Sequence, residues 1–212
     1  MKILKNTLTL VIFLFFILYF PVYSQQKAEK DKPEVGFWLG ASNPLPGTQT
    51  FDLLETTLGF GIFSRFQLPY RSFYTELGMS YANYLSTTER ALTTVPVYAA
   101  IDYKLPFDLP VAIFLKGGLG MSYVVARPAN TNRWDPLLFS GFEVSFTAGK
   151  KVRIGLRIDY NYIFETMNSN IPPKSQYLYQ GVYDDYRLYN PNYYKLMDAQ
   201  FFHFALMLSF LF

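Results

Sequence analysis

Apolar and polar residues alternate one by one along most of the chain, and this period of two predicts β-strands. In the clearest stretch, residues 151–165, the even positions are apolar or aromatic: Val152, Ile154, Leu156, Ile158, Tyr160, Tyr162 and Phe164. Most odd positions there are polar, charged or glycine. A helix would mix these two sets, whereas a strand sends them to opposite faces.

The same alternation recurs along the chain, and no window from residue 35 onward shows a sustained helical period. Eight strands are therefore predicted, at residues 35–41, 55–67, 71–85, 92–104, 110–126, 137–149, 151–165 and 200–212. The connections after the second, fourth and sixth strands are short, and the others are longer, up to residues 166–199. Transmembrane barrels have short periplasmic turns and longer extracellular loops. The predicted fold is all-β, an eight-stranded antiparallel up-and-down transmembrane β-barrel with a periplasmic N-terminus.

Alternation alone fits a secreted soluble barrel as well as a membrane barrel, and the polar set separates the two. It includes mid-strand charges of both signs: Arg65, Glu76, Asp102, Lys116, Glu143, Arg153, Arg157 and Asp159. It also includes many glycines, and small residues between long charged ones suit the narrow interior of an eight-stranded barrel. Aromatic residues lie near strand ends on the apolar face, as an interfacial girdle requires. We therefore predict a polar lumen and a lipid-facing apolar exterior.

The first residues have the pattern of a secretory signal peptide. Lys2 and Lys5 precede an apolar run over residues 8–20, and Val22 and Ser24 suit a small-residue cleavage site. The run is shorter than the about 20 residues that a spanning helix needs. The predicted organisation is a signal peptide at 1–24, a periplasmic lead-in at 25–34 and the barrel at 35–212.

Composition narrows the chemistry. The 212 residues include no cysteine and one histidine, which excludes disulfides, a thiol nucleophile and thiolate metal sites. Without Lys2 and Lys5 the basic residues number 17 against 16 acidic ones, so nucleic-acid binding has no electrostatic support. No cofactor and no metal are expected.

Two strands carry a family resemblance. The stretch TVPVYAA at 94–100, followed by KGGLGMSY at 116–123, resembles the small outer-membrane β-barrel family typified by the OmpA, OmpX and OmpW barrels. The final strand is similar to that family's C-terminal insertion signal, with Phe204, Leu206, Leu208, Phe210 and Phe212. The resemblance implies a monomer in the bacterial outer membrane, in contact with its lipid and inserted by the barrel-assembly machinery. These motifs describe architecture and do not specify a function.

The lumenal charges could form a mutually neutralising plug or line a conduction path. Their signs balance, and a buried charge costs several kcal/mol unless it is paired, so internal pairing is favoured. A selective pore would show a ring of one sign. The expected pairs join Arg153, Arg157 and Asp159 to some of Glu76, Asp102, Glu143, Glu165 and Lys116.

Two further features resemble catalytic or binding motifs only superficially. His203 lies on the polar face, and the position two residues later is Ala205, which breaks the His–Ser spacing of the lipid A deacylase barrels. The glycines at 117–120 lie within a strand, not at the strand-to-helix turn that binds phosphate. The protein is predicted not to be an enzyme.

The last connection is rich in tyrosine: Tyr177, Tyr179, Tyr183, Tyr186, Tyr189, Tyr193 and Tyr194. Tyrosine suits recognition surfaces, so residues 166–199 form either a rim above the lipid or a contact surface for a partner. The predicted function is a non-enzymatic structural or surface-interaction role. The alternatives are a narrow OmpW-like channel for small or hydrophobic solutes and, less favoured, a lipid A-modifying enzyme.

Overall fold

The computed structural model describes residues 32–69, 72–86, 91–107, 109–127, 131–164 and 198–212. Its strands are β1 (Glu34–Pro44), β2 (Thr57–Gln67), β3 (Phe73–Leu85), β4 (Ala91–Lys104), β5 (Ala112–Arg127), β6 (Thr131–Ala148), β7 (Val152–Phe164) and β8 (Asp198–Leu211). One short helix, α2 (Gln49–Leu53), lies between β1 and β2. Within these described ranges no helix is long and apolar enough to span a membrane.

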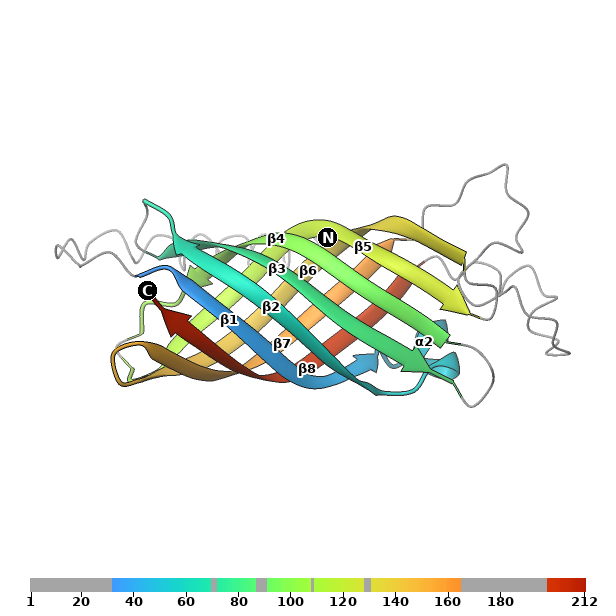
Figure 1. Cartoon of the computed structure of the whole chain (residues 1–212), viewed down its shortest axis with the longest axis horizontal. Coiled ribbons are helices and arrows are strands. Elements are labelled where there is room, and N and C mark those ends of the chain that lie inside the picture. The colour runs from blue at the N-terminus through green and yellow to red at the C-terminus, as the bar shows by residue number, and fades with distance from the viewer. Residues whose placement is uncertain (1–31, 70–71, 87–90, 108, 128–130, 165–197) are drawn as a thin grey trace, which may run out of the picture. The chain divides into compact units, whose positions relative to one another are not determined.

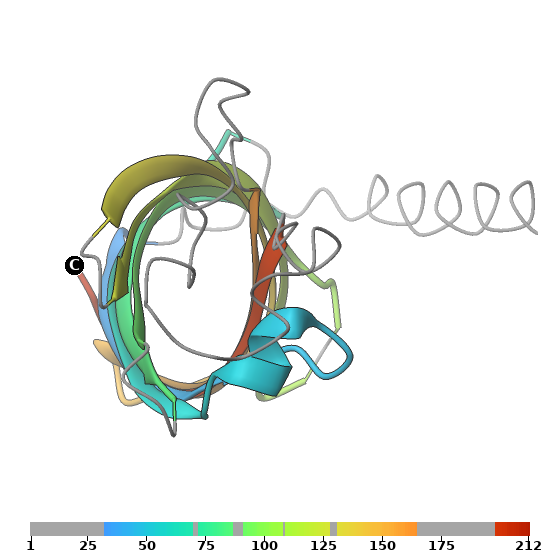
Figure 2. The same ribbon diagram turned by 90° about the vertical axis from the view of Figure 1, so that its right-hand side faces the viewer.

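The strands close into a barrel. Each strand pairs antiparallel with its neighbour in the chain, and β1 pairs with β8 from Glu34↔Leu211 to Pro44↔Phe201 (Figures 1 and 2). Closure leaves no edge strand with unpaired backbone groups. The predicted eight-stranded antiparallel up-and-down barrel is confirmed.

The two faces of the strands separate as the alternation predicts. On β8, Phe204 and Leu206 are 51% and 67% exposed, whereas the intervening Ala205 is 6% exposed and Met207 1% exposed. The same inversion holds on the other strands, so large apolar side chains cover the outside and the charged ones lie inside. This distribution is the reverse of that in a water-soluble barrel and is typical of outer-membrane barrels.

One strand boundary differs substantially from the prediction. β6 begins at Thr131, not at residue 137, and its added residues pair with β5 from Ala126↔Thr131 to Met121↔Pro136. The β6–β7 ladder starts only at Leu137↔Ile163, so Pro136 lies beyond it and its missing N–H removes no hydrogen bond to β7. The connection after β5 shrinks to residues 128–130, and the expected alternation of short and long connections is wrong there.

The barrel also begins one residue early. Glu34, assigned from the sequence to the lead-in, is the first residue of β1. The turn between β6 and β7 contains Gly149 at φ 73°, a backbone conformation that glycine adopts without strain. The predicted signal peptide and the loop tyrosines lie outside the described residues.

Candidate functional site: the barrel lumen

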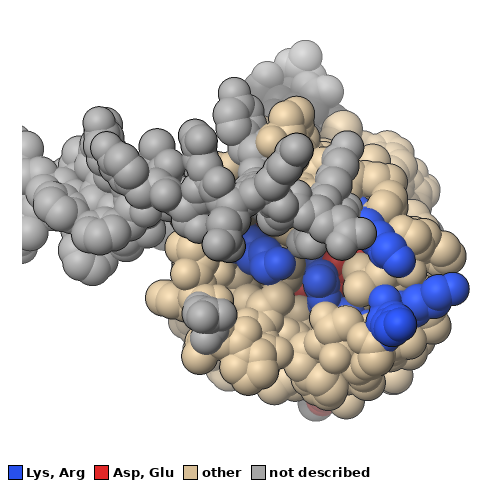
Figure 3. Space-filling model, turned by 90° about the vertical axis from the view of Figure 1, so that its left-hand side faces the viewer, with Lys and Arg blue, Asp and Glu red and all other residues tan. Residues whose placement is uncertain are grey.

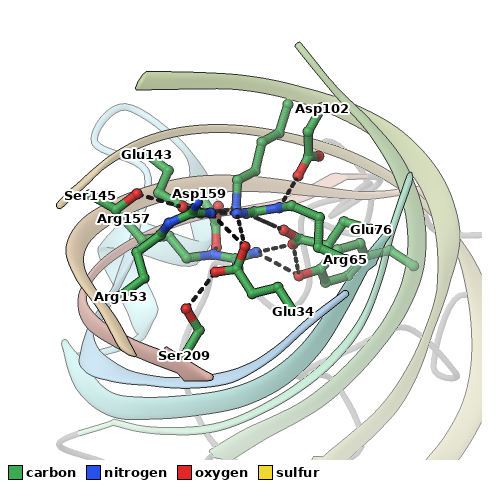
Figure 4. Close-up of polar contacts among 12 residues, drawn as sticks. Glu34, Arg65, Glu76, Asp102, Glu143, Ser145, Arg153, Arg157, Asp159 and Ser209 are labelled. Atoms are coloured by element: carbon green, nitrogen blue, oxygen red, sulfur yellow. Dashed lines mark hydrogen bonds and ion pairs between the residues drawn. The ribbon is translucent and has the colours of Figure 1, made fainter. Parts of the chain in front are cut away.

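The lumen has a charged half and a half that is mainly apolar. We call the end where β1 begins and β8 ends the terminal end, and the opposite end, which carries α2, the α2 end (Figure 1). Charged side chains fill the terminal half, and the members of this lumenal ion network are Glu34, Arg65, Glu76, Asp102, Lys116, Glu143, Arg153, Arg157 and Asp159 (Figure 4). None is more than 7% exposed.

Arg65 is the centre of the network. Its Nε donates to Asp102 Oδ2 at 2.7 Å, and its Nη2 donates to Glu76 Oε2 at 2.7 Å. Glu143 is held by both ends of the guanidinium fork, at 3.1 Å from Nη1 and 2.6 Å from Nη2. Nη1 also donates to Glu34 Oε2 at 3.1 Å. One planar cation therefore ties together carboxylates from β1, β3, β4 and β6, a role that suits the five fixed donors of arginine.

Lys116 and Arg157 join the same carboxylates from other directions. Lys116 Nζ lies 2.9 Å from Glu76 Oε2 and 2.5 Å from Glu143 Oε2. Arg157 Nη2 donates to Glu76 Oε1 at 2.8 Å, and its Nε donates to Asp159. Tyr98 adds a neutral link, because its hydroxyl donates to Glu76 Oε1 at 2.9 Å and accepts from Arg157 Nη2 at 2.5 Å. Each shared carboxylate thus faces more than one donor.

Glu34 closes the network at its terminal end. Its Oε2 accepts from Arg153 Nη1 at 2.6 Å, and its Oε1 accepts from the Ser209 hydroxyl. The sequence analysis expected Arg153 to pair with Glu76, Asp102, Glu143 or Glu165. Its partner is Glu34, so that expectation is wrong. The alternation along β1 could have identified Glu34, because Glu34 lies at the same alternate positions as the inward-facing Gly36, Trp38 and Gly40.

Aromatic rings support the guanidinium groups. The Cζ atom of Arg65 lies 4.4 Å from the ring centre of Phe114, and that of Arg157 lies 5.1 Å from the ring centre of Phe63. Both rings are at most 2% exposed. Cation–π contacts of this kind stabilise a cation that has left water.

The structure brings all eight sequence-predicted lumenal charges into one connected group. Their signs do not balance once Glu34 is included, since four cations (Arg65, Lys116, Arg153, Arg157) face five carboxylates (Glu34, Glu76, Asp102, Glu143, Asp159). Glu165, another expected partner, lies outside the described residues.

The α2 half of the lumen contains a large apolar cluster, which the sequence analysis did not foresee, beside buried polar side chains that include Thr94, Ser122 and Asp135. Its buried cluster comprises Leu54, Ala82, Tyr84, Leu92, Tyr98, Ala100, Val124, Leu137, Phe139, Ile163, Ala199 and Phe201. Two stacked pairs lie within it: the rings of Tyr98 and Phe139 are 4.0 Å apart, and those of Tyr84 and Phe201 are 4.2 Å apart. Leu54, the residue that follows α2, is part of this cluster. We call the cluster the apolar layer.

His203 lies between the two halves, and the strand register places Ser42 and Asp159 beside it on either side. These residue types could form a hydrolytic triad, but their hydrogen bonds go elsewhere. The Ser42 hydroxyl bonds Tyr84, and Asp159 bonds Arg157. His203 Nε2 lies 3.4 Å from Asn161 Nδ2. The side chains of Ser42, Asp159 and His203 are each at most 2% exposed. The geometry is that of a packed interior, with no substrate access to the imidazole.

Metal binding has no support in the described part of the chain. No group of three or more His, Asp or Glu residues there has the geometry to hold a metal ion. The carboxylates that could have served as ligands are already engaged by arginine and lysine. What the site can do chemically is hold charge in fixed pairs.

The fold and the lumen together define a class: small eight-stranded barrels with an apolar exterior and a filled interior. The structure is similar to Neisserial surface protein A (NspA), with a TM-score of 0.57 and 10% identity over 85% of this chain and 96% of that one. At this identity the likeness establishes the fold alone. The resemblance to small outer-membrane barrels is thus confirmed in architecture.

Two other solved structures match with lower TM-scores. The N-terminal β-barrel domain of Pseudomonas aeruginosa OprF matches with a TM-score of 0.46 and 12% identity, over 87% of this chain and all of that one. Ail, the attachment invasion locus protein of Yersinia pestis, matches at 0.43 and 12%, with the same coverage. No protein-family model and no curated protein sequence matches the chain.

Proposed function

We propose that this protein is a non-enzymatic bacterial outer-membrane barrel with a closed lumen, which acts through its place in the membrane and through contacts at the α2 end. The observation that carries the proposal is the filled interior. An ion network with side chains at most 7% exposed occupies one half, and a stacked aromatic layer occupies the other. A solute would have to displace both to cross the barrel.

The membrane location is supported by the outward face. Leu58, Leu119, Leu156 and Leu206 are each more than 60% exposed on different strands. An aqueous exterior would leave this apolar surface in water, and monomeric soluble proteins rarely expose such large contiguous patches.

The orientation follows from the strand number. With eight strands the start of β1 and the end of β8 lie at the same end of the barrel, which a secreted chain would leave in the periplasm. The α2 end, where β7 ends and β8 begins, then faces outward, and the sequence between these two strands includes the tyrosine-rich residues 166–199. We propose that these residues contact external partners, whereas the lumen has a structural role.

A planar-bilayer measurement tests the closed lumen. The purified full chain, refolded in detergent and inserted at low density, should give no discrete conductance steps. A Tyr98→Ala/Phe139→Ala variant, which removes a stacked pair from the apolar layer, is the matched sample with a weakened plug. Reproducible steps from the folded parent would contradict the proposal and favour the narrow channel.

A separate assay addresses enzymatic activity. Lipid A from cells that express the protein should have the same mass spectrum as lipid A from cells without it. Loss or transfer of an acyl chain on expression would support the lipid-modifying alternative. The buried position of His203 is the reason to expect no change.

A further inference from the structure

Exposed charges are segregated between the two barrel ends. Lys32, Lys150 and Lys151 are exposed at the terminal end, where Figure 3 shows basic side chains in the mouth of the barrel and on one side of it. Among the residues whose side chains the structure describes, the only exposed carboxylates are Asp52 and Glu55, next to α2 at the other end. Among the described residues, the exposed charge at the terminal end is therefore basic, although the chain as a whole is close to neutral.

The backbone fixes these lysines around the end of β8. The N–H of Leu211 donates to the carbonyl of Lys151 at 2.8 Å, and the N–H of Phe212 donates to the carbonyl of Pro33 at 2.9 Å. Lys150 and Lys151 follow Gly149 in the tight β6–β7 turn, and Lys32 precedes Pro33. We call Lys32, Lys150 and Lys151 the lysine rim. Even against a terminal carboxylate at Phe212, the rim has net positive charge.

The rim lies directly at the edge of the apolar exterior. Phe212 is 71% exposed between the two lysine segments, and Val35, three residues after Lys32, is 47% exposed. A shallow apolar groove of about 380 Å³ starts at Val35 and crosses the outer face of β1 to β4, lined by Ile62, Leu77, Met79 and Val97. A cationic rim above an apolar wall matches a molecule with an anionic head and a hydrocarbon tail.

We infer that the lysine rim binds the headgroup phosphates of anionic phospholipids in the leaflet at the terminal end of the barrel, while their acyl chains lie along the outer wall. The inference rests on the proposed membrane location. Basic residues beside an anionic leaflet attract its lipids, by about fivefold for each lysine near the surface. A soluble polyanion would satisfy the lysines but would leave the adjacent apolar groove without a partner.

Boundary-lipid selectivity measures this binding directly. The full chain is refolded into phosphatidylcholine vesicles, and electron spin resonance compares spin-labelled phosphatidylglycerol with spin-labelled phosphatidylcholine at the protein surface. We expect the parent to enrich phosphatidylglycerol about two- to fivefold at low salt. The enrichment should fall in 0.5 M NaCl, because about 0.1 M salt already screens exposed charges beyond roughly 10 Å.

Three variants test the role of the rim. Lys32→Gln/Lys150→Gln/Lys151→Gln should reduce the enrichment towards one, and the corresponding triple arginine variant should keep it. Asp52→Asn/Glu55→Gln removes exposed charge at the α2 end and should not lower it. A triple glutamine variant that enriches phosphatidylglycerol as the parent does would overturn the inference.

Two further outcomes are decisive. If the parent shows no lipid selectivity but binds inorganic polyphosphate through the same lysines, the rim serves a soluble anion and the lipid assignment is wrong. If the parent fails to fold in neutral phosphatidylcholine vesicles, judged by heat-modifiable migration and protease protection, the membrane location itself fails. Folding without selectivity refutes the rim alone.

Discussion

Replacing Arg65 with methionine should strongly destabilise the barrel. Arg65 is 1% exposed and contacts four carboxylates at 2.6–3.1 Å. Methionine fills much of the same volume but leaves three cations in the network to face five carboxylates. Among the ion pairs of the described residues, Asp102 pairs with Arg65 alone, so its carboxylate would be stranded.

The magnitude follows from the cost of an uncompensated buried charge. Breaking a buried ion pair by removing one partner costs about 3–5 kcal/mol, because the remaining charge has lost its water as well. Arg65→Met should therefore lower the free energy of unfolding by about that amount. Arg65→Lys should cost less, since it keeps the charge and loses only the fork that holds Glu143 at both oxygens.

The assay is urea unfolding of the refolded protein in vesicles, followed by tryptophan fluorescence and gel mobility. Arg153→Met is the matched control, because Arg153 lies at the mouth of the lumen and its one ion pair within the described part of the chain is to Glu34. Its cost should be smaller. Adding Asp102→Asn to Arg65→Met should recover part of the loss, because it removes the stranded charge. An unchanged midpoint for Arg65→Met, or additive costs in the double variant, would refute the reasoning.

Three other perturbations have definite expected outcomes. Leu206→Arg puts a charge on the lipid face near mid-barrel and should cost about 2–4 kcal/mol in vesicle unfolding, whereas Leu206→Met should be nearly neutral. Gly78→Ala places a Cβ 2.2 Å from Tyr98 and should cost about 1–3 kcal/mol by overpacking, while Gly117→Ala, with nothing within 4 Å, should leave the urea midpoint unchanged. Deleting Phe212 should slow insertion in cells more than it lowers the stability of refolded protein, measured by pulse-chase protease protection; equal effects would argue against a recognition role.

The faces of the strands could be predicted from the sequence because the side-chain period of a strand is two. Once Arg153, Arg157 and Asp159 share a parity, they must share a face, whatever the rest of the fold does. The same rule could have placed Glu34 inside, but its position among the charged residues of the lead-in hid it. Strand ends were less predictable. Proline interrupts a strand only where its missing N–H would have bonded a neighbouring strand, and β6 continues through Pro136 because its ladder with β7 begins only at Leu137.

The partners of each charge depended on the tertiary structure. Arg65 and Glu143 are far apart in sequence and meet across the lumen, at a height that is set by the shear of the closed sheet and not by any local pattern. The apolar layer escaped the sequence analysis for a related reason. Parity tells which side chains point inward, but whether Tyr98 and Phe139 stack on each other or line a channel depends on the barrel radius. The alternating sequence therefore determined inside and outside, and closure of the barrel decided what fills the inside.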